Sequence, residues 1–159
     1  MHPRSSVVLS FVSITCVLAC SDVGNTSNPE VGQVVEDFQL LNSRGEVTTA
    51  FTQADTVVFL YRLHNQTGRD LTVGMAHGGP LVNFTVCQDS QVIRDSFAGY
   101  VFPSNAPSYL FRAGQIFQER WTVSASSFFP RQYTASAKPQ MVVLGIGIPS
   151  ERSITFHVQ

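Results

Sequence analysis

Charged residues are scarce in this sequence, and the two signs are nearly balanced. They make up 13% of the 159 residues, with ten lysines and arginines against eleven aspartates and glutamates. No basic patch and no run of like charge occurs along the chain. A nucleic-acid-binding surface needs clustered positive charge to neutralise phosphates, so we expect no nucleic-acid partner.

The sequence also lacks groups of residues typical of catalysis or metal binding. It has no paired carboxylates and no D-x-D calcium loop, and His64, His77 and His157 lie on separate segments. A nucleophile needs a base and an orienting group within reach, and zinc usually needs four ligands. We therefore predict a protein that is not an enzyme, with no catalytic residue, metal or cofactor. His77, in "MAHGGP", would suit a metal or an oxyanion, although a single loop histidine is typically a polar turn residue.

No apolar run is long enough to span a bilayer as a helix, which takes about 20 residues. The segment "VVLSFVSITCVLA", residues 7–19, is free of charge, follows the positive Arg4 and ends at the small Ala19. This arrangement is typical of a secretory signal. We predict a signal peptide over residues 1–19 and export from the cytoplasm.

The signal ends in "VLAC", residues 17–20, which resembles the bacterial lipobox, with Leu18 a less usual residue at its place. In this interpretation Cys16 leaves with the signal peptide, and Cys20 becomes the lipidated first residue that anchors the protein to a membrane of the cell envelope. Ordinary secretion with a free Cys20 is the alternative. The polar segment at residues 20–34 then predicts a flexible tether, and residues 35–159 a single domain.

Only Cys87 remains of the three cysteines after such processing. No intrachain disulfide is then possible, so the fold must be held by its core. Alternation in "PLVNFTVCQD" places Cys87 on the polar face of a strand, opposite Val82, Phe84 and Val86. Cys87 is either a reactive thiol or a small residue covered by a neighbouring segment.

No segment shows a sustained helical period, whereas short runs with a period of two are separated by turn residues. In "TVVFLYRLHN" the positions Val57, Phe59, Tyr61 and Leu63 form one apolar face. This pattern predicts an all-β fold, an antiparallel immunoglobulin-like β-sandwich. The predicted strands are 36–42, 46–51, 56–64, 70–76, 81–88, 91–96, 108–112, 115–124, 131–138, 140–147 and 153–158.

Three stretches within residues 55–145 resemble the intracellular proteinase inhibitor (BsuPI) type of domain. They begin "LYRLHNQTGRD", "YVFPSNAPSYLFRAG" and "RQYTASAKP". The positions that match the family pattern are Asn65, Phe84, Asp89, Phe102, Gly114, Trp121, Tyr133 and Thr134. Members of this family look like compact immunoglobulin-like sandwiches, and the resemblance implies a protease inhibitor.

The sequence departs from this family at several positions. Ile93 stands near the place of a tryptophan, Ala113 and Gln115 replace Pro and Glu around Gly114, and Arg131 falls near the glycine before the Tyr-Thr pair. The matching residues are those of turns and core, which carry a fold rather than a function. The founding member is named intracellular, whereas this chain carries an export signal, so the target must differ.

The segment "GYVFPSNAPSY", residues 99–109, is the best candidate for a binding surface. It is uncharged, and aromatics beside rigid prolines lose little entropy on binding. Phe102 either contacts a partner or plugs the end of the core, and Trp121 likewise either packs in the core or contacts a partner. We expect a protease or another cell-envelope protein as partner, or alternatively a glycan. The candidate contact residues are Tyr100, Phe102, Pro103, Asn105, Pro107 and Tyr109.

Overall fold

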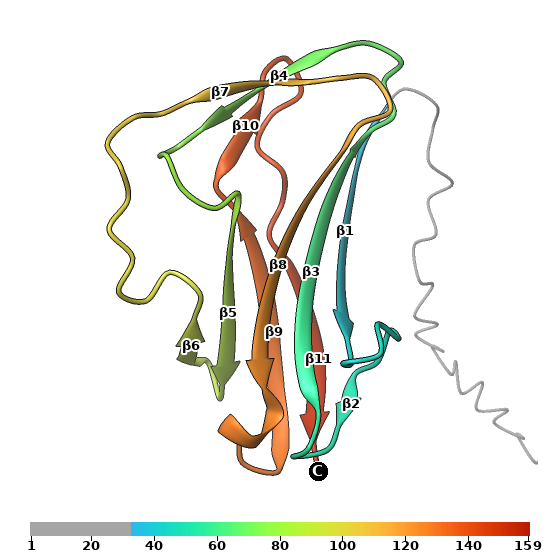
Figure 1. Ribbon diagram of the computed structural model, residues 1–159, viewed down its shortest axis with the longest axis vertical. Coiled ribbons are helices and arrows are strands. Elements are labelled where there is room, and N and C mark those ends of the chain that lie inside the picture. Colours follow the sequence, from blue (N-terminus) through green and yellow to red (C-terminus); the bar gives the residue numbers. More distant parts are fainter. Residues whose placement is uncertain (1–32) are drawn as a thin grey trace, which may run out of the picture.

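The computed structural model describes residues 33–159 and confirms an all-β sandwich (Figure 1). The predicted signal peptide, Cys20 and the tether up to residue 32 lie outside the described residues. The first strand, β1 (Val34–Leu41), begins one residue before the predicted start of the domain. No helix in the described part of the chain is long and apolar enough to cross a membrane.

The predicted strands are present within residues 33–159, together with a single 3₁₀ turn, η1 (Ala125–Ser127). The strands after β1 are β2 (Ala50–Phe51), β3 (Thr56–Asn65), β4 (Leu71–Met75), β5 (Val82–Gln88), β6 (Gln91–Asp95), β7 (Ser108–Phe111), β8 (Ile116–Ser124), β9 (Arg131–Pro139), β10 (Met141–Val143) and β11 (Arg152–Val158).

Two predicted strands are much shorter than expected. The prediction of 46–51 is wrong except at β2, because the Asn42 carboxamide accepts hydrogen bonds from the N–H groups of Arg44 and Glu46 and draws this segment into a turn. The prediction of 140–147 holds only over β10. Gly145 and Gly147 have φ angles of 81° and 130°, which turn the chain away from the sheet.

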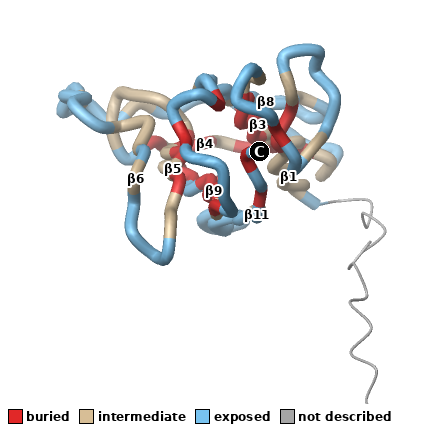
Figure 2. The backbone as a smooth tube through the Cα atoms, turned by 90° about the horizontal axis from the view of Figure 1, so that it is seen from below, coloured by how far each residue is buried: buried red, intermediate tan, exposed pale blue. Residues whose placement is uncertain are grey.

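Hydrogen bonds join the strands into three sheets, in the orders β1-β3-β8, β10-β4-β7 and β2-β11-β9-β5-β6. All pairs are antiparallel except β2 with β11. The first and third sheets face each other along the length of the domain, while β4, β7 and β10 cross one end (Figure 1). Buried positions lie on the strands toward the interior, and most connections are exposed (Figure 2).

The core forms where the predicted apolar faces meet. Val57, Phe59, Tyr61 and Leu63 of β3 are each at most 1% exposed, as their alternation predicts. Phe59 lies at the centre, with its ring centroid 6.0 Å from that of Phe84 on β5. The second face of β3 is also partly buried, because Val58 and Leu60 form a small cluster with Leu41. Burial of these apolar side chains supplies most of the driving force for folding.

Two of the positions that match the family pattern, Asp89 and Gly114, lie in turns. Asp89 and Ser90, with φ angles of 48° and 67°, form the two-residue connection between β5 and β6, where Gln88 pairs with Gln91. Positive φ at both central residues is the mark of a type I′ hairpin turn. Gly114, with φ of 74°, lies in the turn from β7 to β8. These residues therefore have structural roles.

One buried polar group is unpaired in this core. The Tyr61 hydroxyl is buried without a hydrogen-bond partner in the described part of the chain. Burial raises the pKa of Tyr61 above its ordinary value of 10.0, and the negative charge of Glu36 raises it further. The folded state therefore resists ionisation of Tyr61, and this contribution to stability is lost as the pH rises above about 10.

We expect Tyr61→Phe to raise the free energy of unfolding by about 1 kcal/mol at neutral pH, because it removes an unpaired hydroxyl. It should also flatten the decline in stability above about pH 10, where Tyr61 of the unfolded chain ionises. Urea unfolding as a function of pH measures both effects. Tyr109→Phe, at a 48% exposed tyrosine, is the control. An equal decline in both variants would contradict the assignment to Tyr61.

Candidate functional site

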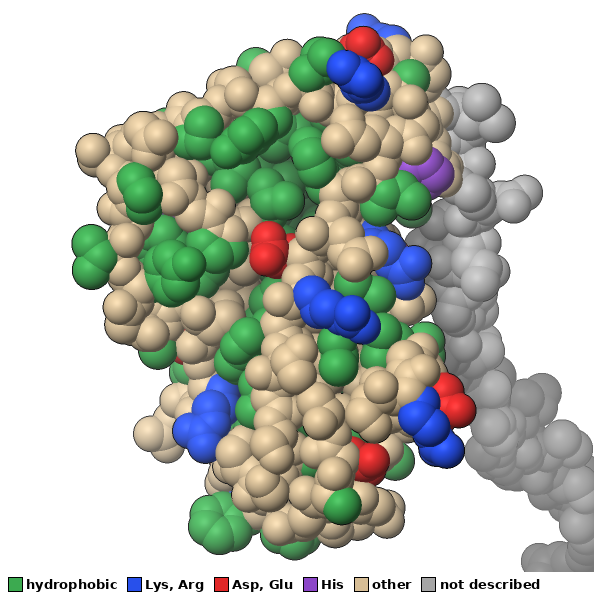
Figure 3. Space-filling model, in the orientation of Figure 1, with side chains coloured by type: hydrophobic (Ala, Val, Ile, Leu, Met, Phe, Trp, Pro, Cys, Tyr) green, Lys and Arg blue, Asp and Glu red, His purple; other side chains and the backbone are tan. Residues whose placement is uncertain are grey.

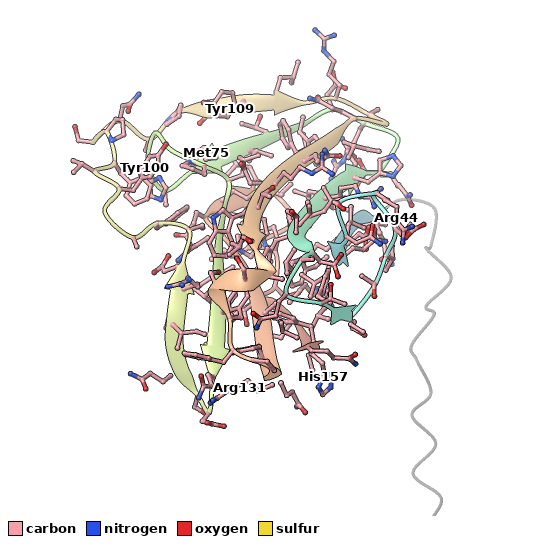
Figure 4. The ribbon with its side chains drawn as sticks, turned by 60° about the horizontal axis from the view of Figure 1, so that its bottom comes forward. Arg44, Met75, Tyr100, Tyr109, Arg131 and His157 are labelled. Carbon is pink, nitrogen blue, oxygen red and sulfur yellow. The ribbon has the colours of Figure 1, made fainter. Side chains whose placement is uncertain are left out.

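The predicted contact loop joins β6 to β7 and lies at the end of the domain crossed by β4 and β7. Its exposed residues include Tyr100 (56%), Val101 (90%) and Tyr109 (48%), whereas Phe102 is half-buried. Tyr109 belongs to β7, where it pairs with Val73. Met75, Tyr100 and Tyr109 lie toward the same end, away from Arg131 and His157 (Figure 4). The loop is thus a surface feature at one end of the sandwich.

Hydrogen bonds hold the loop at both of its ends. At its start, the Asp95 carboxylate accepts a hydrogen bond from Phe97 N at 2.8 Å, and Tyr100 N donates to Phe97 O at 2.9 Å. At its far end, Met75 N donates to Pro107 O at 3.0 Å. A longer bond of 3.4 Å runs from Gly78 N to Pro103 O. The loop backbone is therefore tied to the β4–β5 connection.

Phe102 anchors the loop through an aromatic cluster, which we define as His77, Phe97, Tyr100 and Phe102. The Phe102 ring stacks on His77, with ring centroids 3.9 Å apart and planes 24° apart. The Phe97 ring meets the Phe102 ring edge-on, with centroids 4.7 Å apart. The Tyr100 ring stacks on the Phe102 ring, with centroids 5.3 Å apart. Phe102 thus joins the loop to the β4–β5 connection through His77, and it does not belong to the main core.

Gly78 and Gly79 allow the loop to approach the β4–β5 connection closely. A Cβ atom at Gly79 would lie 2.6 Å from Cδ1 of Phe102, and one at Gly78 would clash with Asn105. Neither glycine has a positive φ, so their role is to leave space for the loop. The sequence pattern predicted a turn at "HGGP", and the contact of its two glycines with the loop was not predicted. Adjacent glycines between two strands were the available signal that another segment packs closely there.

A hollow of about 250 Å³ lies beside the aromatic cluster. Glu119 is its one charged lining residue, and its carboxylate accepts a hydrogen bond from Leu81 N at 3.2 Å. Hydrophobic side chains gather over this end of the domain, with an acidic side chain beside them (Figure 3). An apolar hollow with one carboxylate suits a group that is largely apolar and carries a hydrogen-bond donor or positive charge. The lining residues are Met75, Gly79, Leu81, Tyr109, Phe117 and Glu119.

The hollow was not anticipated from the sequence, because its parts come from four separate segments. Phe117, Glu119 and Trp121 alternate along β8 and are all half-buried. The Trp121 ring packs on Phe59 with centroids 4.8 Å apart, which supports the packing interpretation. Trp121 also lines a smaller hollow of about 90 Å³ with Phe97, so it is not fully enclosed.

The remaining candidate residues do not converge. His64 lies on β3 with its Nδ1 2.9 Å from the Gln66 amide, His77 belongs to the aromatic cluster, and His157 is exposed on β11. Within residues 33–159 no group of three or more His, Cys, Asp or Glu residues could hold a metal ion. The buried Nδ1 of His77 has no hydrogen-bond partner in the described part of the chain. The position of His77 is set by its stacking on Phe102.

Cys87 is neither fully exposed, as a reactive thiol would be, nor fully covered by a neighbouring segment. It is a free thiol on β5, paired with Val92 of β6 and Thr134 of β9, and it is half-buried. Its backbone neighbours lie on both sides, so the strand is not at the sheet edge. The residue does face away from the core formed by Val82, Phe84 and Val86, as its alternation predicts.

No protein-family model and no curated protein matches this chain. Among solved structures, it is similar to the C-terminal domain of Wzt, with 14% identity and a TM-score of 0.44, covering 80% of this chain and 75% of that one. It is also similar to Spo0M, a sporulation control protein from Bacillus subtilis, with 11% identity and a TM-score of 0.46, covering 81% and 50%.

The third similarity is to a β-glucosidase, EmGH1, from Erythrobacter marinus, with 10% identity and a TM-score of 0.39. It covers 79% of this chain and 16% of the enzyme, so the chain corresponds to a small part of that protein. The chain likewise spans half of Spo0M. All three similarities are distant and concern the β-sandwich fold alone.

Proposed function

We propose that this protein is an exported, lipid-anchored and non-enzymatic binding module of the cell envelope. Its contact surface is the loop at residues 99–109 together with the hollow beside it. The observation that carries this proposal is the preorganised loop. Phe102 is stacked on His77 inside the aromatic cluster, while Tyr100 and Val101 remain exposed. A loop that is already shaped loses little conformational entropy when it binds a partner.

A protease is the partner that we propose first. The BsuPI resemblance at residues 55–145 motivates this choice, and an inhibitor needs a stiff, exposed loop that survives contact with the protease. The 99–109 loop has this character, because it is tied down by hydrogen bonds to Pro103 and Pro107 and by the Phe102 ring. The family positions Asn65, Gly114 and Asp89 serve the fold, so inhibition depends on the loop itself.

A glycan is the second candidate, because of the chemistry of the hollow. Tyr109 and Phe117 offer aromatic rings, and the Glu119 carboxylate beside them can accept hydrogen bonds from hydroxyl groups. Sugar rings present apolar faces and hydroxyl edges, and such a hollow is complementary to both. In this case the loop serves as a rim, and Glu119 determines affinity.

We would titrate the Cys20→Ala chain against serine proteases and follow both residual activity and the integrity of the chain. Stoichiometric loss of activity with an intact chain supports inhibition, and replacing Tyr100 and Val101 by serine should weaken it at least tenfold, roughly 1.4 kcal/mol. Phe129→Ser is the matched control, since Phe129 is 72% exposed and lies outside the loop. Full protease activity at excess protein would refute inhibition.

The same variants distinguish the remaining partners. Binding to an envelope glycan that is lost in Glu119→Gln and kept in the Tyr100 and Val101 variant would favour the hollow as the binding site. Intact-mass measurement should find a diacylglyceryl group on Cys20 that the Cys20→Ala chain lacks, and a mature wild-type chain without this group would overturn the lipid anchor. These measurements test the anchor and the contact surface separately, because each variant changes a different part of the protein.

A further inference from the structure

A turn of exposed aliphatic side chains projects from the end of the domain crossed by β4, β7 and β10. We define this aliphatic turn as residues 142–148. Four of its side chains are exposed: Val142 (38%), Leu144 (54%), Ile146 (50%) and Ile148 (72%). The surrounding segment from 139 to 150 contains no Asp, Glu, Lys, Arg or His. A contiguous exposed apolar surface of this kind marks an interaction site.

Four backbone N–H groups of the aliphatic turn are paired within the protein. Val143 N and Gly147 N donate to Gly147 O and Val143 O, each at 2.9 Å, and Ile146 N donates to Val143 O at 3.0 Å. Leu144 N donates to Thr72 O on β4 at 2.9 Å. A segment that enters an apolar phase must have its N–H groups paired, because unpaired ones cost several kcal/mol there. The turn meets this condition at these four positions.

The turn also lies where the N-terminal segment joins the domain. The carboxylate of Glu36, near the start of β1, accepts hydrogen bonds from Ser150 N at 3.1 and 3.2 Å and from Arg152 Nε at 3.3 Å. The start of β1 and the strands β4, β7 and β10 lie at the same end of the domain (Figure 1). The segment that follows Ile148 is therefore tied directly to the strand that follows the tether.

The distance to a lipid at Cys20 is limited by the number of intervening residues. Twelve residues lie between Cys20 and Gln33, and even fully extended the thirteen steps from Cys20 to Gln33 span no more than about 45 Å. A lipid at Cys20 therefore limits the distance of the start of β1 from the bilayer and allows this end of the domain to contact it. This step rests on the lipid anchor of the proposed function.

We propose that the aliphatic turn inserts its side chains into the surface of the membrane that carries the lipid anchor. A hollow of about 530 Å³ beside it is lined by Gly74, Val142, Leu144 and Ile148 and has Lys138 at its rim. Lipid acyl chains need apolar contact without polar complementarity, and the ammonium of Lys138 can meet a phosphate headgroup. Protein interfaces are instead enriched in aromatic residues and arginine, which the turn lacks.

The test places an environment-sensitive fluorophore on the full mature chain. In a Cys87→Ser background, Ile146→Cys labels the aliphatic turn. Val92→Cys is the control, since Val92 is 52% exposed against 50% for Ile146 and belongs to β6, an edge strand of the five-stranded sheet that lies away from β10 (Figure 1). In vesicles of phosphatidylethanolamine and phosphatidylglycerol, we expect a blue shift and quenching by spin-labelled lipid at residue 146, several-fold stronger than at residue 92. Equal signals at the two positions would overturn the proposal.

The Cys20→Ala chain, mixed with the same vesicles, tests the aliphatic turn without the lipid anchor. A failure of the anchor and a failure of the turn therefore give different results. A blue shift at residue 146 there would support lipid contact by the turn alone, and its absence in both the anchored and unanchored chains would refute it. Replacing both Ile146 and Ile148 by serine should weaken vesicle binding of the unanchored chain about tenfold. Crosslinking from residue 146 to an envelope protein, without lipid quenching, would instead show that the turn binds a protein.

Discussion

Replacing Phe59 by alanine is expected to lower the free energy of unfolding by about 4 kcal/mol, the largest effect of any substitution considered. Phe59 lies on the central strand β3 and is 0% exposed. Its ring contacts those of Phe84, Trp121 and Phe156, with centroids 6.0, 4.8 and 6.5 Å away. These rings come from both facing sheets, so the lost side chain leaves a cavity that no single strand can close.

Urea unfolding followed by Trp121 fluorescence measures this effect, because the indole packs on the Phe59 ring. Phe129→Ala is the matched control, since the same atoms are removed from a 72% exposed ring, and we expect a loss below about 1 kcal/mol there. Similar losses for the two variants would mean that the facing sheets are not packed around Phe59. Phe59→Leu should recover much of the stability, because it refills part of the cavity.

Replacing Asn65 by alanine is expected to lower the free energy of unfolding by about 3 kcal/mol, since buried polar partners are left unpaired. The Asn65 side chain is 0% exposed. Its amide donates to Arg69 O at 2.8 Å and to Phe111 O at 2.9 Å. Its oxygen accepts from the N–H and hydroxyl of Thr67 at 3.1 and 2.7 Å. The side chain thereby ties the β3–β4 turn to β7.

Asn65→Asp tests the direction of these bonds. Aspartate keeps the oxygen that accepts from Thr67 but cannot donate to the carbonyls of Arg69 and Phe111 when ionised, so we expect it to be as destabilising as alanine at neutral pH. Asn105→Ala, at an exposed asparagine, should change the free energy of unfolding by less than about 0.5 kcal/mol. Thermal unfolding compares the three variants. Full stability in Asn65→Ala would contradict the role assigned to this network.

The proposed membrane contact and the proposed binding loop lie at the same end of the domain but offer different chemistry. The aliphatic turn offers only aliphatic side chains, whereas the 99–109 loop offers aromatic rings beside the carboxylate of Glu119. The exposed loop tip joins β6 to β7, and the turn follows β10, at opposite edges of the β10-β4-β7 sheet. A partner could therefore reach the loop while the turn contacts lipid.

Local sequence was sufficient for most of the strands and for their inward faces. Alternation with a period of two is a property of consecutive residues, so Val57, Phe59, Tyr61 and Leu63 could be assigned to one buried face. The same holds for Val82, Phe84 and Val86 of β5. The two shortened strands were misjudged where a local device overrode the alternation: the Asn42 side chain in one case and the glycines at 145 and 147 in the other.

The candidate site could be predicted in part. Composition indicated the 99–109 loop as a candidate, and the structure shows that Tyr100 and Tyr109 are exposed there while Phe102 is half-buried. Its anchoring by Phe102 on His77 was not predicted, because these residues belong to connections separated by two strands, β5 and β6. The role of Glu119 was missed for the same reason, since its partner Leu81 is 38 residues away in the chain.

What the sequence by itself determined is therefore the fold class, most of the strand positions and the inward faces of β3 and β5. The tertiary structure alone decided which segments meet: the two glycines with the loop, Glu119 with the hollow, and Glu36 with the segment that follows the aliphatic turn. The physical reason is that alternation and turn propensity act over a few residues, whereas these contacts depend on the order of strands across three sheets. That order is selected by the packing of the whole core, to which every strand contributes.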